Sequence, residues 1–477
     1  IFYALLINAF LLKFNFHQIK IFLKNLIYEI SISKKIFFKK INLKKTLFLF
    51  LILIILIQIF CLTIRFIMPV THGDQIGQYF YDSLQISRLN NLSLPEYYEI
   101  GGRLRTDSMA SFFDAITLQY TNNWILVRSF RFVSLILVIC NSLEIFYNLG
   151  NFNIKKSLLL ICIIITLPDI WDISLSGKHD VYVFLFENIG IYSIILSVLF
   201  SDKILKLIFS FIAVLIGIAS VSVRLSSLSF LVISFILLFY YLSRSPISLY
   251  KEKLKLIFSI RSLMSFLLII TIISPTMIIC LINYKFLSNP FYYISPPGFF
   301  SNIFPNAEYG LNYSDVKNNL SMNNIPIVLK SIATFLYATL GLEPIRYGLT
   351  KLQENWSLLN PTSNLLNYIG PKHLMVSMLS LSPFSLMPFI KIKNIKESKK
   401  QFLLVILVAW IMLWTFSIPY TRVAIASSLT LIILGFSIPF GDLKYRNIII
   451  NKSIYYIFLS YGLITICLFS FWSISTV

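Results

Sequence analysis

Charge is scarce in this chain: Asp, Glu, Lys and Arg together make up 13% of its 477 residues, while hydrophobic residues make up 57%. A soluble domain with this balance would expose large apolar patches and aggregate. Long apolar runs cross the sequence instead, and those at 46–70, 205–223 and 454–471 are long enough to span a hydrocarbon core of about 30 Å. We therefore expect an all-α fold, a polytopic transmembrane helical bundle of about 11 spans.

Cysteine is rare and never has the spacing of a redox or metal motif. All five cysteines fall inside apolar runs, and none has a CxxC partner: Cys61, Cys140, Cys162, Cys280 and Cys467. Thiols buried in lipid behave as small hydrophobes, so we expect neither disulfides nor a thiolate metal site. A Gly-rich nucleotide loop is missing as well, because Gly101 and Gly102 lack the flanking strand and helix of a dinucleotide site. The absence of this loop argues against an enzyme that uses a nucleotide-activated donor.

Acids are the scarcest charged residues, with 20 Asp and Glu against 41 Lys and Arg and a net charge of +21. Such an excess is also typical of nucleic-acid-binding proteins. Here, however, the cations lie beside the apolar runs, where they set membrane orientation and contact anionic headgroups. No nucleic-acid motif accompanies them. We therefore expect membrane lipids, and no nucleic acid, as the partners of these cations.

The distribution of charge predicts a topology for an integral, multi-pass membrane protein. Residues 1–45 carry many lysines against one acid, Glu29, and form a basic cytoplasmic segment. Residues 46–477 form the transmembrane domain, with outer loops at 71–124, 169–180 and 284–372. The apolar segment 325–342 would reverse every later loop if it crossed, so we expect it to lie in the interface or to re-enter. The expected spans are 46–70, 125–147, 157–168 with a turn added at either end, 181–200, 205–223, 226–243, 262–283, 373–390, 402–417, 421–439 and 454–473.

The first outer loop holds acids that follow closely on the first span. Asp74 lies a few residues past the span, so its carboxylate is expected near the headgroups. Residues 78–89 have the pattern of a short amphipathic juxtamembrane helix, with Ile86 toward lipid and Asp82 and Arg88 toward water. An Asp in such a loop, Asp114 included, is more often a solvated charge or a helix cap than a catalytic group.

The second outer loop, 169–180, packs three carboxylates, Lys178 and His179 into twelve residues. Asp180 has two interpretations. It could cap the helix that follows, where a negative charge is favoured. Alternatively, Lys178 and His179 supply positive charge for a phosphate while the acids orient a hydroxyl or a divalent metal ion. A lone His does not argue for zinc, and no other cofactor is predicted.

Three further charges lie within or at the ends of the predicted spans. Glu187 follows Asp180 by two helical turns on the same face, and an acid at that depth should face the protein interior and have a partner. Arg224 and Arg422 are expected at outer helix ends. Their guanidinium forks suit phosphate oxygens, although an Arg at such a position also snorkels to headgroups.

Four local features together resemble the GT-C superfamily of integral-membrane glycosyltransferases, over about 46–471. They are the long loop with Asp74 near its start, the Lys178-His179-Asp180 element that opens span four, the stretch 283–292, and the Tyr420-Thr421-Arg422 element before span ten. The stretch 283–292, with Asn-Pro near its end, is similar to a G-N-P-x-x-P sequence of bacterial members. The Tyr-Thr-Arg element is similar to an Arg-Tyr element of the superfamily.

The resemblance implies a protein of a bacterial inner membrane that transfers a sugar from a polyprenyl-phosphate donor to a glycan, lipid or protein acceptor on the extracytoplasmic face, with inversion. It implies that Asp74 is the general base and that Asp180, with Lys178 and His179, lines the donor pocket. Arg224 and Arg422, beside Tyr420, would hold the lipid phosphate, whose growing negative charge they stabilise. Three alternatives stay open: an O-antigen-type polymerase or ligase, a lipid or solute transporter, and a non-catalytic scaffold.

Overall fold

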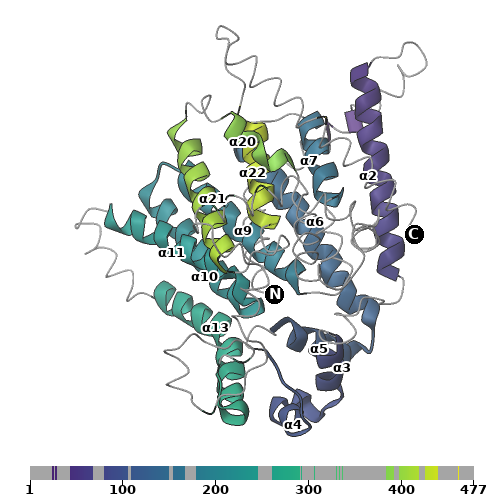
Figure 1. Cartoon of the computed structure of the whole chain (residues 1–477), viewed down its shortest axis with the longest axis vertical. Coiled ribbons are helices and arrows are strands. Elements are labelled where there is room, and N and C mark those ends of the chain that lie inside the picture. Colours follow the sequence, from purple (N-terminus) through teal and green to yellow (C-terminus); the bar gives the residue numbers. More distant parts are fainter. Residues whose placement is uncertain are drawn as a thin grey trace, which may run out of the picture. The chain divides into compact units, whose positions relative to one another are not determined.

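Figure 1 shows the computed structural model of the chain, in which helix accounts for 89% of the described residues and none of these residues lies in a strand. The expected all-α fold class is confirmed for this part of the chain. Most of the predicted spans 373–390 and 454–473 lies outside the described residues. Those residues are 43–67, 80–105, 109–149, 154–166, 179–244, 260–290, 383–391, 397–417 and 425–438, with the single positions 24, 25, 27, 28, 292, 306, 329, 332, 336 and 460.

Three helices are long and apolar enough to cross a membrane: α6 (Trp124–Asn148), α9 (Asp180–Leu199) and α10 (Lys203–Val223). At 1.5 Å per residue they extend over about 30–38 Å, which matches a hydrocarbon core of about 30 Å. Their bounds agree within two residues with the predicted spans. Other helices also coincide with predicted spans: α2 (Leu43–Ile67), α7 (Ile154–Thr166), α11 (Leu228–Ser243), α13 (Ile260–Leu287), α21 (Ser398–Ser417) and α22 (Ile425–Ser437).

The chain divides into two compact units. The first comprises 1–69, 135–175 and 327–477, and the second comprises 70–134 and 176–326. In the first unit α2 packs on α7, and α22 packs on α21 and on the short pair η4 (Pro383–Leu386) and α20 (Met387–Ile390). In the second unit α10 packs on both α9 and α11. The expected boundary after residue 45 stays a prediction, because only a few positions of residues 1–45 are described.

Helix α9 is the central element of the second unit. Every residue from Asp180 to Val198 is buried, which is the pattern of a helix enclosed by others on all sides. A glycine allows its closest contact: a Cβ at Gly190 would lie 2.4 Å from the ring of Phe230 on α11. Gly217 of α10 makes similar room for Leu231. These close approaches fix α9, α10 and α11 as one tightly packed set.

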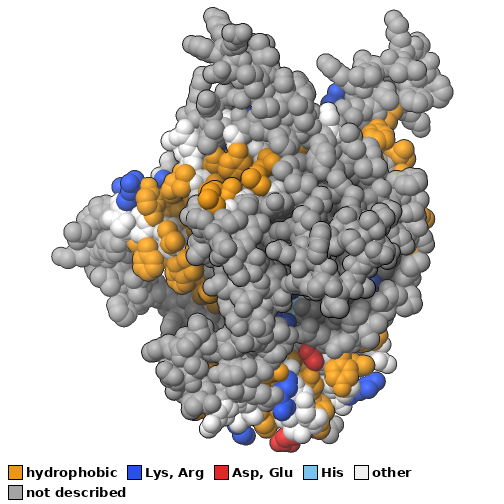
Figure 2. Space-filling model, in the orientation of Figure 1, with side chains coloured by type: hydrophobic (Ala, Val, Ile, Leu, Met, Phe, Trp, Pro, Cys, Tyr) orange, Lys and Arg blue, Asp and Glu red, His pale blue; other side chains and the backbone are white. Residues whose placement is uncertain are grey.

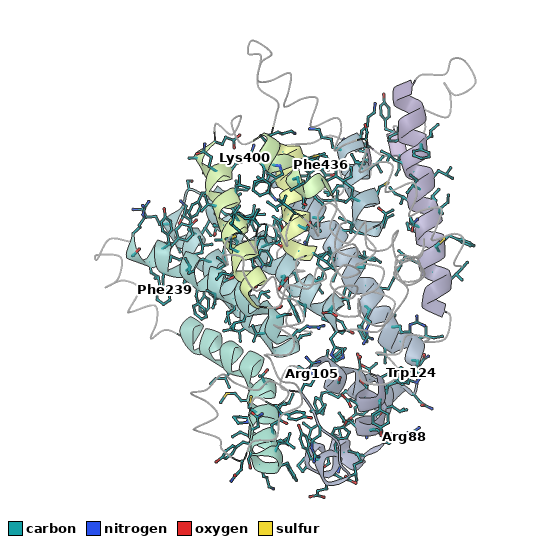
Figure 3. The ribbon with its side chains drawn as sticks, in the orientation of Figure 1. Arg88, Arg105, Trp124, Phe239, Lys400 and Phe436 are labelled. Atoms are coloured by element: carbon teal, nitrogen blue, oxygen red, sulfur yellow. The ribbon has the colours of Figure 1, made fainter. Side chains whose placement is uncertain are left out.

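Apolar side chains on the outside of the helices repeat at helical spacing. On α11 the exposed residues Val232, Phe235, Ile236 and Phe239 follow one another at i, i+3, i+4 and i+7. Figure 2 shows hydrophobic side chains where Figure 1 draws this helix, and in Figure 3 the labelled Phe239 points away from the ribbon. A stripe of this kind would be unfavourable in water and is favourable against lipid.

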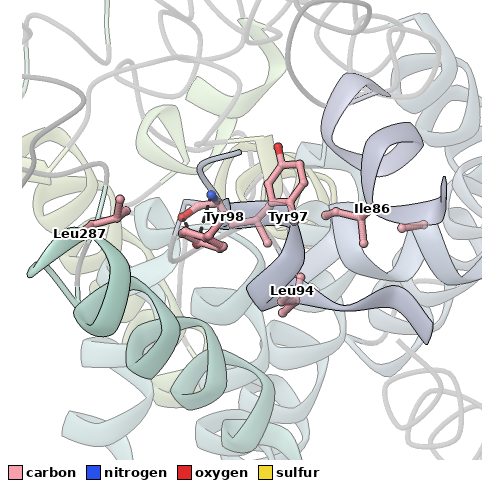
Figure 4. Packing of buried hydrophobic residues seen from close by; sticks show 7 residues of the cluster. Ile86, Leu94, Tyr97, Tyr98 and Leu287 are labelled. Atoms are coloured by element: carbon pink, nitrogen blue, oxygen red, sulfur yellow. Dashed lines mark hydrogen bonds between the residues drawn. The ribbon is translucent and has the colours of Figure 1, made fainter. Parts of the chain in front are cut away.

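The described residues of the first outer loop contain three α-helices, whereas the sequence pattern located one amphipathic helix, at 78–89. They are α3 (Phe80–Arg88), α4 (Leu94–Glu99) and α5 (Met109–Thr121). Two expectations for α3 are wrong. Ile86 is fully buried, in a cluster with Leu94, Tyr97, Tyr98, Leu104, Ala115 and Leu287 (Figure 4). Asp82 is half-buried and accepts a hydrogen bond of 2.8 Å from the Tyr97 hydroxyl.

Helices α4 and α5 together explain both corrections, because both pack on α3. Ala115 of α5 and Tyr97 of α4 share the cluster of Ile86, and Tyr97 also binds Asp82. The start of α4 has a clear local cause. Ser93 accepts a hydrogen bond from the amide of Glu96, and Pro95 occupies the first turn, where its missing N–H costs nothing. Tyr98 then donates a hydrogen bond to the side-chain oxygen of Asn283 on α13, which ties this subdomain to the end of a long helix.

Two lysines of the first unit bind the C-terminal carbonyls of α22. Lys391 donates to Gly435 and Ile438 at 2.9 Å each, and Lys156 donates to Phe436 at 3.2 Å. Positive charge at a helix C-terminus satisfies carbonyls that have no partner within the helix. These three chain segments were all assigned to the cytoplasmic side, so their contact agrees with the predicted topology.

Candidate functional site

The first turn of α9 carries a buried ion pair with the end of α10. Asp180 is 4% exposed, and its carboxylate accepts a hydrogen bond from the guanidinium of Arg224, the residue that ends α10. The geometry follows from the helix lengths. Helices of 20 and 21 residues joined by the short turn 200–202 return the chain to the same level, so residues 44 apart in the sequence meet. Asp202 fixes this turn by accepting bonds from the amides of Ile204 and Leu205.

A second buried ion pair joins α5 to α6. Arg131 donates to Asp114 at 2.5 Å, and both side chains are 4% exposed. Asn123 starts α6 by accepting a bond from the amide of Ile125, and the turn sets α5 against the first half of α6. The Arg131 guanidinium also lies 5.4 Å from the ring centre of Tyr182 on α9. This cation–π contact brings the second pair to the same end of α9 as the first.

His179 lies next to both pairs and is 2% exposed. Its Nε2 atom is 3.3 Å from the hydroxyl of Ser111 on α5. Burial, together with the positive charges of Arg131, Arg224 and Arg105, holds the pKa of His179 well below its usual value of 6.5. The imidazole is therefore neutral at physiological pH. We call this group of residues the α9 cluster: Ser111, Asp114, Arg131, His179, Asp180, Tyr182 and Arg224.

Positive charge exceeds negative charge around the α9 cluster. Arg128 is buried and close enough to Arg131 to repel it, and Arg105 acts on both His179 and Asp82. Guanidinium groups in a low-dielectric environment attract anions strongly, and their planar forks fit the oxygens of a phosphate or carboxylate. The two aspartates hold Arg131 and Arg224 in fixed orientations. The arrangement is that of a preformed anion site whose cations are already positioned.

Glu187 lies two turns further along α9 and is buried, as expected for an acid at that depth. Its partner is Ser227, in the turn between α10 and α11, whose hydroxyl also accepts a 2.8 Å bond from Ser220. The same turn carries Arg224. The polar contacts thus continue from the α9 cluster into the interior of the second unit.

The structure brings together three of the predicted site residues: His179, Asp180 and Arg224. The guanidinium of Arg224 donates to Asp180, which favours the interpretation of Arg224 as a site residue over that of a snorkelling anchor. Asp180 occupies the first turn of α9 without capping it, and its carboxylate orients Arg224. The other four predicted residues lie outside the described part of the chain: Asp74, Lys178, Tyr420 and Arg422.

The sequence pattern did not predict four members of the cluster. Asp114 has the position of a solvated charge or a cap, and Ser111, Arg131 and Tyr182 are not among the predicted site residues. A signal was present, since Arg128 and Arg131 both fall inside the predicted span 125–147. Ionisable residues in a membrane segment face the protein and have partners, so an acid near the start of this span should have been sought.

No family model, no curated protein and no solved structure matches this chain. Among the described residues, no three His, Cys, Asp or Glu side chains come together as a set of metal ligands.

Proposed function

We propose that the chain is a GT-C-type glycosyltransferase, a bundle of about 11 spans in a bacterial inner membrane. It would transfer a sugar from a polyprenyl-phosphate donor to a glycan, lipid or protein acceptor on the extracytoplasmic face. The observation that supports this most directly is the ion pair of Asp180 with Arg224, whose charge also acts on the neighbouring His179. The positive-inside pattern assigns all three to the outer face, which is where a lipid-linked donor presents its phosphate.

The α9 cluster supplies what such a reaction needs at the leaving group. The acceptor oxygen attacks the anomeric carbon and forms a new C–O bond. The bond from that carbon to the phosphate oxygen breaks, and its electron pair leaves with the phosphate. Arg224 and Arg131 would stabilise the growing negative charge without a general acid, because they are already oriented before the donor binds. Neutral His179 would donate a hydrogen bond to a phosphate oxygen.

The acceptor proton needs a base, and the sequence offers Asp74 in this role. Attack from the face opposite the phosphate inverts the anomeric centre. Asp180 and Asp114 would serve as positioning residues, since their carboxylates contact the two arginines.

The test is the transfer activity of the purified full-length chain with polyprenyl-phosphate sugars. Arg224→Lys keeps the charge but loses the fork, so transfer should fall by roughly ten- to a hundredfold, as for the loss of one or two charge-assisted hydrogen bonds. Arg88→Gln, on the exposed side of α3, is the control and should be silent. Equal activity of the Arg224→Lys protein and wild type would remove Arg224 from the mechanism. In cells, a deletion strain should accumulate one polyprenyl-phosphate sugar, which identifies the donor.

Glu187 favours one alternative, a transporter, because a buried acid inside a membrane bundle often carries protons or ions. Proteoliposomes separate the two functions. If the chain is a glycosyltransferase, neither wild type nor the Glu187→Gln protein should show proton-coupled flux. Flux in wild type that the substitution abolishes would favour the transporter.

A further inference from the structure

An apolar pocket of about 230 Å³ lies in the first unit, away from the residues of the α9 cluster in the sequence. Every side chain that lines it is apolar. The wall is formed by α21, by the η4–α20 pair and by two positions four residues apart in the segment 325–342: Val408, Met412, Leu386, Phe389, Ile332 and Leu336. Because Val408 is partly exposed on the outside of α21, the pocket is accessible from the surface of this helix.

The depth of the pocket is set by the start of α21. Val408 and Met412 follow Lys399 by nine and thirteen residues, or about 14–20 Å along the helix axis. Half of a hydrocarbon core is about 15 Å thick. If Lys399 lies at the headgroups, the pocket therefore lies at the depth of the lipid acyl chains of the same leaflet.

The sequence that leads into α21 is basic. Residues 391–400 contain five lysines and one acid, Glu397. Lys400, labelled at the end of α21 in Figure 3, pairs with Glu397 at 2.9 Å, and Lys391 binds the carbonyls of α22. Lys399 is exposed at the first turn of α21, where backbone amides also favour an anion. Positive charge thus lies about one acyl-chain length from an apolar pocket.

We propose that this pocket holds an acyl chain of an anionic glycerophospholipid, whose phosphate lies beside Lys399 at the start of α21. Lipid tails are as apolar as the pocket, so burial alone gives no preference for it, and packing and charge must supply the selectivity. In a zwitterionic lipid the positive headgroup cancels the attraction of the phosphate to Lys399. A polyprenyl-phosphate donor has its phosphate at the opposite face in the predicted topology, which leaves a phospholipid of the cytoplasmic leaflet as the occupant. The inference does not rest on the proposed enzymatic activity.

The experiment is native mass spectrometry of the purified full-length protein with added palmitoyl-oleoyl phosphatidylglycerol or phosphatidylcholine. Wild type should retain phosphatidylglycerol at least about fivefold more strongly, as expected for one lysine near the phosphate. Lys399→Gln should remove most of that preference and leave phosphatidylcholine unchanged. Val408→Trp fills the pocket and should abolish retention. Val405→Trp adds the same ring to an exposed site one turn away on α21 and should retain the lipid.

A second measurement keeps the proposal testable if Val408→Trp does not fold. Phosphatidylglycerol with a diazirine in the middle of its acyl chain should label the wild-type peptide that contains Val408 and Met412, and Met412→Phe should reduce this labelling. Equal retention by folded Val408→Trp and Val405→Trp proteins would overturn the proposal. So would stronger competition for this labelling by undecaprenyl phosphate than by phosphatidylglycerol, or a Lys399→Gln protein with an unchanged preference.

Discussion

Folding changes the pKa of the Asp82 carboxyl group. Burial raises its pKa from 3.8 to about 6, although the Tyr97 hydroxyl and Arg105 oppose the change. Between these pH values the folded protein holds a proton that the unfolded chain has released, so stability should fall as pH rises from about 4 through 6. Asp82→Asn keeps an acceptor for Tyr97 without the charge. It should match wild type below about pH 4 and be more stable by about 1–3 kcal/mol at pH 7.

Denaturant titration of the detergent-solubilised protein between pH 4 and 8 measures this difference. Glu99→Gln, on the exposed end of α4, is the matched control and should follow wild type throughout. A constant difference between Asp82→Asn and wild type across the pH range would mean that the substitution acts through packing, and the carboxyl would then not be the titrating group.

Substitutions in the ion pair of Asp114 and Arg131 separate an effect on stability from an effect on sugar transfer. Arg131→Met leaves a buried carboxylate without its partner and should cost about 3–5 kcal/mol. The double variant Asp114→Leu with Arg131→Met removes both charges and should recover most of this loss. If Arg131 also binds the donor phosphate, the double variant folds but transfers no sugar. Full transfer by the stable double variant would show that the pair is purely structural.

At the scale of elements, Gly190 decides how closely α9 and α11 pack. A Cβ there would lie 2.4 Å from the Phe230 ring, so Gly190→Ala should destabilise the protein by about 1–3 kcal/mol through overpacking. Phe230→Leu alone leaves a cavity and also destabilises. Together the two changes should compensate, which a double-mutant cycle measures as a favourable coupling. Additive losses would show that the ring moves aside freely and that the contact does not hold α9 against α11.

Long helices were the most predictable elements, because apolar length alone signals a span. The bounds of α6, α9 and α10 could be read from the sequence within two residues. Apolar periodicity does not reveal helix α4, although Ser93 and Glu96 have the spacing of a capping box. Without α4, and with α5 not placed against α3, the sequence pattern gives the wrong environment for Asp82 and Ile86.

The candidate site was only partly predictable, for a reason that belongs to the whole molecule. His179, Asp180 and Arg224 stand at the ends of predicted spans, so sidedness alone places them on one face. Asp114 and Arg131 form an ion pair because the turn between α5 and α6 places the two helices side by side. The angle between these helices cannot be read from the sequence. Buried pairs formed between helices depend on how the helices pack, which hydrophobic periodicity does not specify.

Most of the proposals depend on which side of the membrane each segment of the chain faces. The contacts of Asp180 with Arg224, and of Lys391 with the end of α22, each join segments that the charge pattern assigns to one side. Cysteine introduced at the exposed Thr121, the last residue of α5, should react with an impermeant maleimide in intact cells. Cysteine at the exposed Ser398 should react only after permeabilisation.

The native cysteines provide the background for this measurement. Among the described residues the four native thiols are buried or partly buried in helices, so wild-type protein should label weakly in both conditions. Labelling in the reverse order would move the α9 cluster to the cytoplasmic face. The phosphate of a polyprenyl-phosphate donor would then lie on the same face as the basic start of α21. Both the proposed glycosyl transfer at Arg224 and the proposed phospholipid at Lys399 would have to be abandoned.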